Sequence, residues 1–128
     1  MNRFTLTLML VLAAGQARAE TPQQILDQLT REAGSASASR GEQFYKARQG
    51  GGEAESCAAC HTPDPRKGGQ HVKTHKAIDP LAPVANRERF TDPAKVEKWF
   101  KRHCKEVLGR VCTPHEKADF AAYVISVK

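Results

Sequence analysis

The segment Cys-Ala-Ala-Cys-His at residues 57–61 places the tightest constraint on what this chain can fold into. Two cysteines three residues apart lie on one side of a helical turn, so that both thiols can add to the two vinyl groups of a single haem. His61 then lies beneath the iron as its proximal ligand. The motif therefore predicts one covalently attached haem c, bound through Cys57, Cys60 and His61.

Three other interpretations of this motif fit the rest of the sequence less well. A thioredoxin-like dithiol needs a strand–helix–strand context, and the chain shows no strand-like alternation of apolar residues. A zinc site needs a second ligand pair at close spacing, whereas seven residues separate Cys104 from Cys112. A disulfide between Cys57 and Cys60 would not account for the histidine that follows them.

The N-terminal segment predicts export. Residues 1–19 contain Arg3, an uncharged apolar run over 4–14, and the sequence Ala-Arg-Ala at 17–19, a pattern typical of a secretory signal cleaved after Ala19. The apolar run is too short to span a bilayer. We therefore expect a periplasmic protein that does not span the membrane once the signal is removed.

The size and charge of the chain narrow its function further. A chain of 128 residues, shortened by the signal, supports one small domain with a marginal core, to which a buried haem adds apolar surface. The formal net charge of +6 includes the two signal arginines, and the remaining basic residues are scattered among acidic ones. This pattern does not predict nucleic-acid binding, which favours a dense basic patch.

Helix signals dominate the sequence and, together with the predicted haem, indicate an all-α protein with a small cytochrome c fold wrapped around one covalently attached haem. Residues 20–39 are expected to form an N-terminal helix, opened by a capping box at Thr21 and ended at Gly34, and a small-residue linker at 35–39. Residues 40–128 are expected to form the cytochrome c domain, against which that helix packs. Further helices are predicted at 40–48, at 56–61, from Pro93 to Gly109 and from Pro114 onward, with a long irregular loop over 62–90.

The helix that begins at Pro93 has the clearest apolar periodicity. Its apolar positions recur at helical spacing and place His103 on the face expected to turn toward the core, in line with Val96, Trp99, Phe100 and Val107. Methionine, a common second ligand of haem iron, is absent after the signal, because both methionines precede residue 10. We therefore predict His103 as the distal ligand of the haem iron.

Other ligands remain open as alternatives. They are His71, His75, His115, Asn86, a lysine, or no sixth ligand at all. His71 and His75 lie in a loop rich in glycine and lysine and are predicted to be solvated, without a role. His115 lies in the first turn of the last helix, where an exposed side chain is expected.

Cys104 and Cys112 are predicted to form a disulfide that joins the His103 helix to the last helix. In an oxidising compartment each cysteine needs a partner, and these two remain after the haem motif is assigned. A loop of this length is stabilised by roughly 2–3 kcal/mol on cross-linking. Two free, buried thiols are the alternative.

From about Gly41 onward, the sequence resembles the cytochromes c″ and the related sphaeroides haem proteins. The resemblance rests on the haem motif and on four further segments: Ile-Asp-Pro-Leu-Ala-Pro at 78–83, Arg-Phe-Thr-Asp at 89–92, the run ending Gly-Arg-Val-Cys at 101–112, and the run beginning Thr-Pro-His-Glu at 113–123. In the sphaeroides group an asparagine stands at the position matching His103, and the reduced protein binds oxygen or nitric oxide. A histidine at this position is the cytochrome c″ pattern.

The resemblance implies a ferric haem with two histidine ligands, of which the distal one leaves the iron on reduction and takes up a proton. It also implies a redox partner such as a dihaem cytochrome c or a membrane cytochrome b. The main functional hypothesis is therefore a periplasmic one-electron carrier. The alternative is a protein that binds O₂ or NO, or reduces a small substrate, at the vacated site. A third possibility is a carrier that keeps both histidines.

An enzymatic role has less support in the sequence, and no catalytic residue is identified. The polar candidates near the distal side are His103 itself, Arg102 and Lys105, which offer no clear proton donor for turnover.

Overall fold

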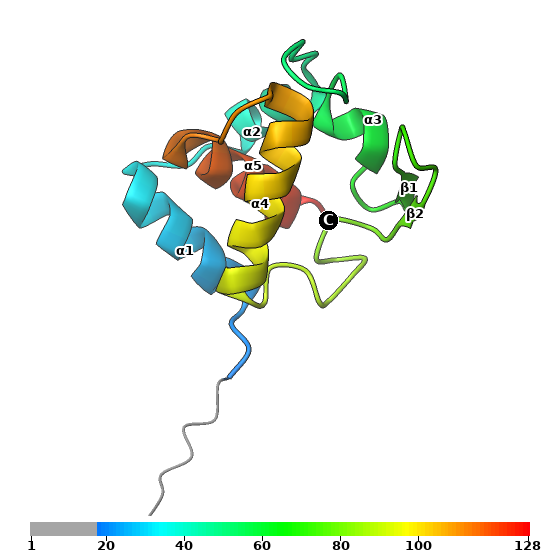
Figure 1. The fold of residues 1–128 in the computed structure, drawn as a ribbon. Coiled ribbons are helices and arrows are strands. Elements are labelled where there is room, and N and C mark those ends of the chain that lie inside the picture. The colour runs from blue at the N-terminus through cyan, green and yellow to red at the C-terminus, as the bar shows by residue number, and fades with distance from the viewer. Residues whose placement is uncertain (1–17) are drawn as a thin grey trace, which may run out of the picture.

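The computed structural model describes residues 18–128. The predicted signal, residues 1–19, lies outside the described residues apart from its last two. This part of the chain contains five helices and a two-stranded antiparallel sheet, whose arrangement Figure 1 shows. The elements are α1 (Pro22–Ala33), α2 (Ala38–Lys46), α3 (Cys57–His61), β1 (Gly69–Gln70), β2 (Ala77–Ile78), α4 (Pro93–Leu108) and α5 (Pro114–Ser126).

Three helices begin at the capping residues that the sequence indicates. The hydroxyl groups of Thr21 and Thr113 accept hydrogen bonds from backbone N–H groups in the first turns of α1 and α5, and both capping boxes are complete. The Asp92 carboxylate caps α4, which ends at Gly109 in the left-handed conformation with φ 70°. The mostly helical fold is therefore confirmed.

The start of α2 differs from the prediction. The helix begins at Ala38 and ends at Lys46, each two residues earlier than expected, because the Ser37 hydroxyl caps it by accepting from the Arg40 N–H. A serine N-cap satisfies an otherwise unpaired donor of the first turn. The predicted linker at 35–39 therefore shrinks to the few residues before Ser37.

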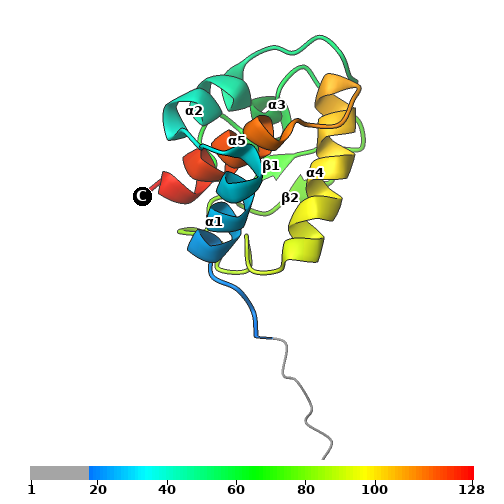
Figure 2. The ribbon, with the colours of Figure 1, turned by 90° about the vertical axis from the view of Figure 1, so that its left-hand side faces the viewer.

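The helices α1 and α2 both pack against α5 (Figure 2). Gly41 allows α2 and α5 to approach closely, because a Cβ atom at this position would overlap the Asp119 carbonyl. Tyr45, fully buried, stacks against the rings of Phe120 and Tyr123. Side chains of α1, α4 and α5 belong to one hydrophobic cluster. It includes Ile25 and Leu29 of α1, Phe100 and Cys104 of α4, and Ala121 and Val124 of α5.

A bidentate ion pair ties α2 to α5. The Arg40 guanidinium donates to both carboxylate oxygens of Asp119 at 2.7 and 2.8 Å, and the Ser37 N–H donates to the same carboxylate at 2.6 Å. Burial opposes ionisation of Asp119, but these hydrogen bonds outweigh it and lower its pKa. The buried carboxylate is therefore satisfied as an anion.

The segment from 62 to 90 is mostly irregular, as expected, but it contains a short hairpin that the sequence did not indicate. Strands β1 and β2 pair antiparallel, with Gly69 opposite Ile78 and Gln70 opposite Ala77. Farther along, the Leu81 and Ala82 N–H groups both donate to the Pro65 carbonyl. The segment therefore folds back on itself beside α3. None of the helices within residues 18–128 combines the length and apolarity needed to cross a membrane.

Candidate haem site

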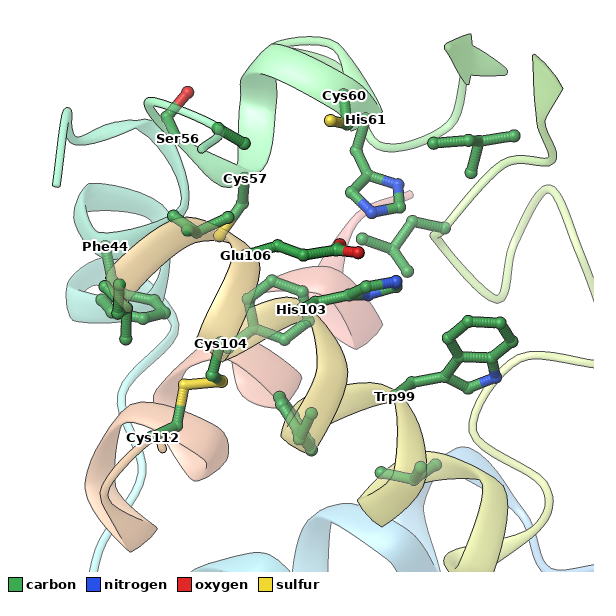
Figure 3. Close-up of a pocket in the computed structure, with 18 of the residues that line it drawn as sticks. Phe44, Ser56, Cys57, Cys60, His61, Trp99, His103, Cys104, Glu106 and Cys112 are labelled. Atoms are coloured by element: carbon green, nitrogen blue, oxygen red, sulfur yellow. A yellow bond between two sulfur atoms is a disulfide. The ribbon is translucent and has the colours of Figure 1, made fainter. Parts of the chain in front are cut away.

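A large cavity lies between α3, α4 and the 62–90 segment (Figure 3). It contains about 970 Å³ of space that no atom fills, part of which is open to solvent. Sites for cofactors are generally concave and mainly apolar. Here the apolar lining comes from elements far apart in the sequence: Phe44, Ile78, Leu81, Phe90, Val96, Phe100, Val107, Leu108 and Phe120.

The haem motif forms the short helix α3 at one wall of this cavity. Ser56 caps the helix by accepting from the Ala59 N–H at 3.0 Å, and Cys57, Cys60 and His61 all line the cavity. The two cysteines are free thiols, without a disulfide between them. One helical turn thus presents two thiols and an imidazole to the same space.

Burial raises the pKa of the Cys57 thiol to about 12. Dithiol oxidoreductases instead need a cysteine whose pKa is lowered, so that the reactive thiolate is present near neutral pH. The environment of Cys57 therefore argues against the thioredoxin-like interpretation of the motif.

His61 and His103 face each other across the cavity. Their ring centres are 5.8 Å apart and the ring planes make an angle of 60° (Figure 3). A metal held between two imidazole nitrogens at about 2 Å each separates the ring centres by roughly 6 Å. The spacing therefore fits one iron atom between the two rings, and the apolar walls fit a macrocycle around it.

Both histidines are held in the neutral form that binds metals. Burial, together with the nearby His103 and Arg89, lowers the pKa of His61 to about 4. Burial also lowers the pKa of His103, although the Glu106 carboxylate opposes this shift. A neutral imidazole has a free nitrogen lone pair for coordination, whereas an imidazolium has none.

Trp99 lies differently from the prediction. The apolar periodicity of α4 placed it in the core, but its side chain is 41% exposed at the rim of the cavity. The centre of its ring lies 5.1 Å from the centre of the His103 ring at an angle of 31°, and the Arg102 guanidinium lies over it, 5.8 Å from its centre. Trp99 therefore bridges the distal histidine and the surface.

Two further polar side chains line the cavity: His71, an alternative ligand in the sequence analysis, and Glu106, which the sequence did not single out. His71, predicted to be solvated, faces the cavity from beside β1, with its Nε2 atom 3.9 Å from the Glu106 carboxylate of α4. Glu106 also accepts from Arg102 at 3.2 Å. Glu106 could have been found from the sequence, because it lies three residues after His103 on the same helix. The position of His71 could not, because it depends on the pairing of β1 with β2.

The remaining candidate ligands lie elsewhere. His75 and His115 are exposed and do not line the cavity. The Asn86 side chain donates to the Pro80 carbonyl and accepts from the Glu88 N–H, which makes it part of a turn. Within residues 18–128, no group of three or more His, Cys, Asp or Glu side chains is arranged to hold a metal ion by itself.

A disulfide joins Cys104 to Cys112, with their Cα atoms 5.6 Å apart. This is the pairing expected from the sequence. It connects α4, at the residue next to His103, to the segment that leads into α5 (Figure 3). The bond limits how far the end of α4 that carries His103 can shift.

Comparison with known proteins agrees with this geometry. Residues 31–124 match the family model described as Domain of unknown function (DUF1924). The cytochrome c-type protein SHP of Cereibacter sphaeroides is 44% identical over 128 residues, which cover 97% of this chain and 98% of the relative. The chain belongs to the SHP family. The match extends beyond the stretch from Gly41 that carries the resemblance seen in the sequence.

Cytochrome c″ of Methylophilus methylotrophus is a second relative, 48% identical over 75 residues that cover 59% of this chain and 52% of the relative. The solved structure of oxidised SHP, described as an oxygen-binding cytochrome c, has a TM-score of 0.78 at 44% identity and covers 83% of this chain and 96% of its own. Oxidised cytochrome c″ has a TM-score of 0.74 at 35% identity, covering 84% and 94%. This SHP-family chain therefore has the cytochrome c fold and carries covalently attached haem c.

Proposed function

We propose that this SHP-family protein is a periplasmic one-electron carrier whose haem is held by Cys57, Cys60, His61 and His103. The thiols of Cys57 and Cys60 form the covalent links, and His61 is the proximal ligand. His103 is the distal ligand of the ferric state. The observation that carries the proposal is the pair of facing imidazole rings, 5.8 Å apart across an apolar cavity.

The haem supplies a one-electron Fe(III)/Fe(II) couple at this site. The chain supplies a mainly apolar cavity, and two neutral imidazoles that enter it from opposite walls. His61 comes from a short helix fixed at both ends, and His103 from the middle of α4.

We propose further that His103 leaves the iron on reduction and takes up a proton at the nitrogen it frees. The absence of a methionine after the predicted signal and the resemblance to cytochrome c″ support this step. Because the disulfide at Cys104 restrains α4, the release is a rotation of the His103 side chain rather than a shift of the helix. The Glu106 carboxylate favours the protonated imidazole electrostatically.

Proton uptake on reduction makes the reduction potential depend on pH. Because a proton is consumed when the electron arrives, the potential falls as pH rises, with a slope of at most about 59 mV per pH unit for one proton per electron. A potentiometric titration of the holoprotein from pH 5 to 8 measures this slope. A flat potential over that range contradicts the proposed release and protonation of His103.

The physiological partner that we propose is a dihaem cytochrome c or a membrane cytochrome b. This part of the proposal rests on the resemblance to the family.

A second function, binding of O₂ or NO in the reduced state, has its own support. The solved SHP structure is described as an oxygen-binding cytochrome c. Release of His103 opens a position beside His71 and Glu106, two polar side chains able to contact a small ligand. Reduction of a small substrate at this position is the enzymatic form of the same alternative.

Spectroscopy of the holoprotein separates these functions. Absorption and low-temperature EPR spectra of the ferric form are compared with spectra of the dithionite-reduced form, with and without NO. Low-spin ferric and high-spin ferrous haem that is open to NO supports release of His103. Low-spin haem in both states indicates a carrier that keeps both histidines, and high-spin ferric haem contradicts ligation by His103.

The substitution His103→Asn tests the distal ligand directly. Asparagine is the residue that the sphaeroides group has at the matching position. We expect the variant to retain covalent haem and to lose the pH dependence of its potential between pH 5 and 8, because the titrating imidazole is gone. An unchanged pH dependence would assign the proton to another group.

A further inference from the structure

One face of α4 carries a row of basic side chains at helical spacing. Lys95, Lys98, Arg102 and Lys105 are all exposed, and steps of three, four and three residues place them along one side of the helix. The row is about 15 Å long at 1.5 Å per residue. Although the sequence as a whole mixes its charges, the fold thus collects four positive charges on one face.

Few acidic side chains compensate this row. Glu106 pairs with Arg102 at 3.2 Å, and Glu97 turns away to pair with Lys117. Among the ion pairs formed within residues 18–128, none involves Lys95, Lys98 or Lys105. The face therefore has a net positive potential that an acidic surface can complement.

Trp99 lies beside this row and connects it to the haem site. Its partly exposed ring is tilted by 31° from the plane of the His103 ring, with the two centres 5.1 Å apart. The Arg102 guanidinium lies over the Trp99 ring, 5.8 Å from its centre. A partner that docks on the row therefore contacts an aromatic side chain that touches the distal ligand directly.

We propose that the α4 basic face, formed by Lys95, Lys98, Trp99, Arg102 and Lys105, is the docking surface for an acidic redox protein that donates the electron. This inference rests on the proposed electron-carrier function. One electron leaves the reduced cofactor of the partner, passes by way of Trp99 and His103, and converts ferric to ferrous iron. No bond forms or breaks in the transfer itself.

The proposed role is specific to the donor. The contact from Trp99 through His103 reaches the iron only while His103 is a ligand, which is the ferric state in the proposed cycle. A second copy of this chain is a poor occupant, because it presents the same positive charge. A membrane is disfavoured because Trp99 is the only large apolar side chain of α4 that is exposed.

The test compares two charge-reversal variants of the holoprotein. The double variant Lys98→Glu/Lys105→Glu alters the basic face. The control Arg31→Glu/Lys67→Glu makes the same change in net charge at exposed positions on α1 and in the 62–90 segment, away from α4. Reduced flavodoxin, an acidic one-electron donor, and the cationic complex hexaammineruthenium(II) are the two reductants, followed by stopped flow at low ionic strength.

We expect flavodoxin to reduce the double variant at about one tenth of the wild-type rate or below. The rate for the control variant should stay within about twofold of the wild-type rate. With the ruthenium complex, the double variant should react faster than the wild type. Carbodiimide cross-linking to oxidised flavodoxin, analysed by mass spectrometry, provides a readout independent of electron transfer, and we expect cross-links at Lys95, Lys98 and Lys105.

Equal slowing of both variants, or cross-links spread over other lysines, would overturn the docking surface while leaving the electron carrier intact. Failure of the holoprotein to undergo reversible one-electron reduction by dithionite would instead overturn the proposed function. Cosedimentation with phosphatidylglycerol vesicles is the third arm. The proposal would be overturned if the wild type bound the vesicles, Lys98→Glu/Lys105→Glu did not, and both were reduced by flavodoxin at the same rate. The basic face would then be a membrane-binding surface.

Discussion

The two sides of the haem site are built differently. On the proximal side, His61 comes from a five-residue helix that Ser56 caps, and the Tyr45 hydroxyl donates to the carbonyl of the next residue, Thr62, at 2.6 Å. On the distal side, His103 comes from the sixteen-residue helix α4 and has charged neighbours and a partly exposed tryptophan beside it.

The backbone accentuates this difference. Thr62 has φ 65° and ψ 161°, a conformation that residues other than glycine rarely adopt. The surrounding hydrogen bonds hold it there, including the one from the Tyr45 hydroxyl. The distal helix has regular geometry and is restrained by one disulfide. The proximal wall is thus fixed by many local contacts, whereas the distal wall leaves room for a side chain to move.

The largest effect is expected from removing the covalent links. Cys57→Ala/Cys60→Ala should abolish covalent haem attachment, because no other free thiols lie in residues 18–128. A pyridine haemochrome assay of the denatured, acid-acetone-extracted protein measures the retained haem. The matched variant Cys104→Ala/Cys112→Ala, which removes two cysteines of the distal wall, should retain it. Covalent haem in the first variant would disprove the proposed attachment.

Acid should destabilise the holoprotein through the two histidines. Burial lowers the pKa of His61 from 6.5 to about 4, and coordination to iron lowers it further, so the stability that this residue contributes above pH 6.5 is lost progressively as the pH falls. The loss amounts to about 3 kcal/mol for this residue alone.

Guanidinium unfolding at several pH values measures this loss. His103→Asn sharpens the comparison of the two walls, because it should reduce the proton uptake on unfolding and leave the part due to His61. A stability that is constant from pH 6.5 to 4.5 would contradict the prediction.

Opening the disulfide should weaken the distal wall by roughly 2–3 kcal/mol. In Cys104→Ala/Cys112→Ala we also expect faster binding of NO to the ferric protein, because α4 is less restrained and His103 detaches more readily. Stopped-flow absorption measures that rate. An unchanged NO rate with a lowered stability would show that the disulfide stabilises the fold without controlling His103.

The smallest effect is expected from Tyr45→Phe, which removes the hydroxyl that holds the Thr62 carbonyl. We expect a loss of about 1 kcal/mol in unfolding free energy and a shifted iron–histidine stretching frequency in the resonance Raman spectrum of the reduced protein. Tyr123→Phe is the control, because its hydroxyl donates no hydrogen bond within the described residues. If the two variants gave the same iron–histidine frequency, the Tyr45 hydroxyl would have no part in orienting His61.

Local signals explain why much of this structure could be predicted. The starts of α1, α4 and α5 depend on capping residues that lie within three positions of the helix. The facing positions of His61 and His103 followed from a short motif and from the periodicity of one helix.

Contacts between distant segments explain the rest. His71 reaches the cavity because β1 pairs with β2. Only two residues of each strand pair, which is too few to give an alternation of apolar and polar residues in the sequence. Trp99 shares the apolar periodicity of α4. Periodicity shows which face of the helix a side chain lies on, but not whether another segment covers that side chain. The basic row was also hidden, because its members are interrupted in sequence by acidic and apolar residues.

The burial of Cys57 has a consequence for biosynthesis. In the folded chain its thiol has a pKa of about 12, so almost none is present as the thiolate that bonds to a vinyl group. We therefore expect haem attachment to precede folding, while the thiol of the newly exported chain is still accessible. In that order, the cavity closes around a haem that is already attached.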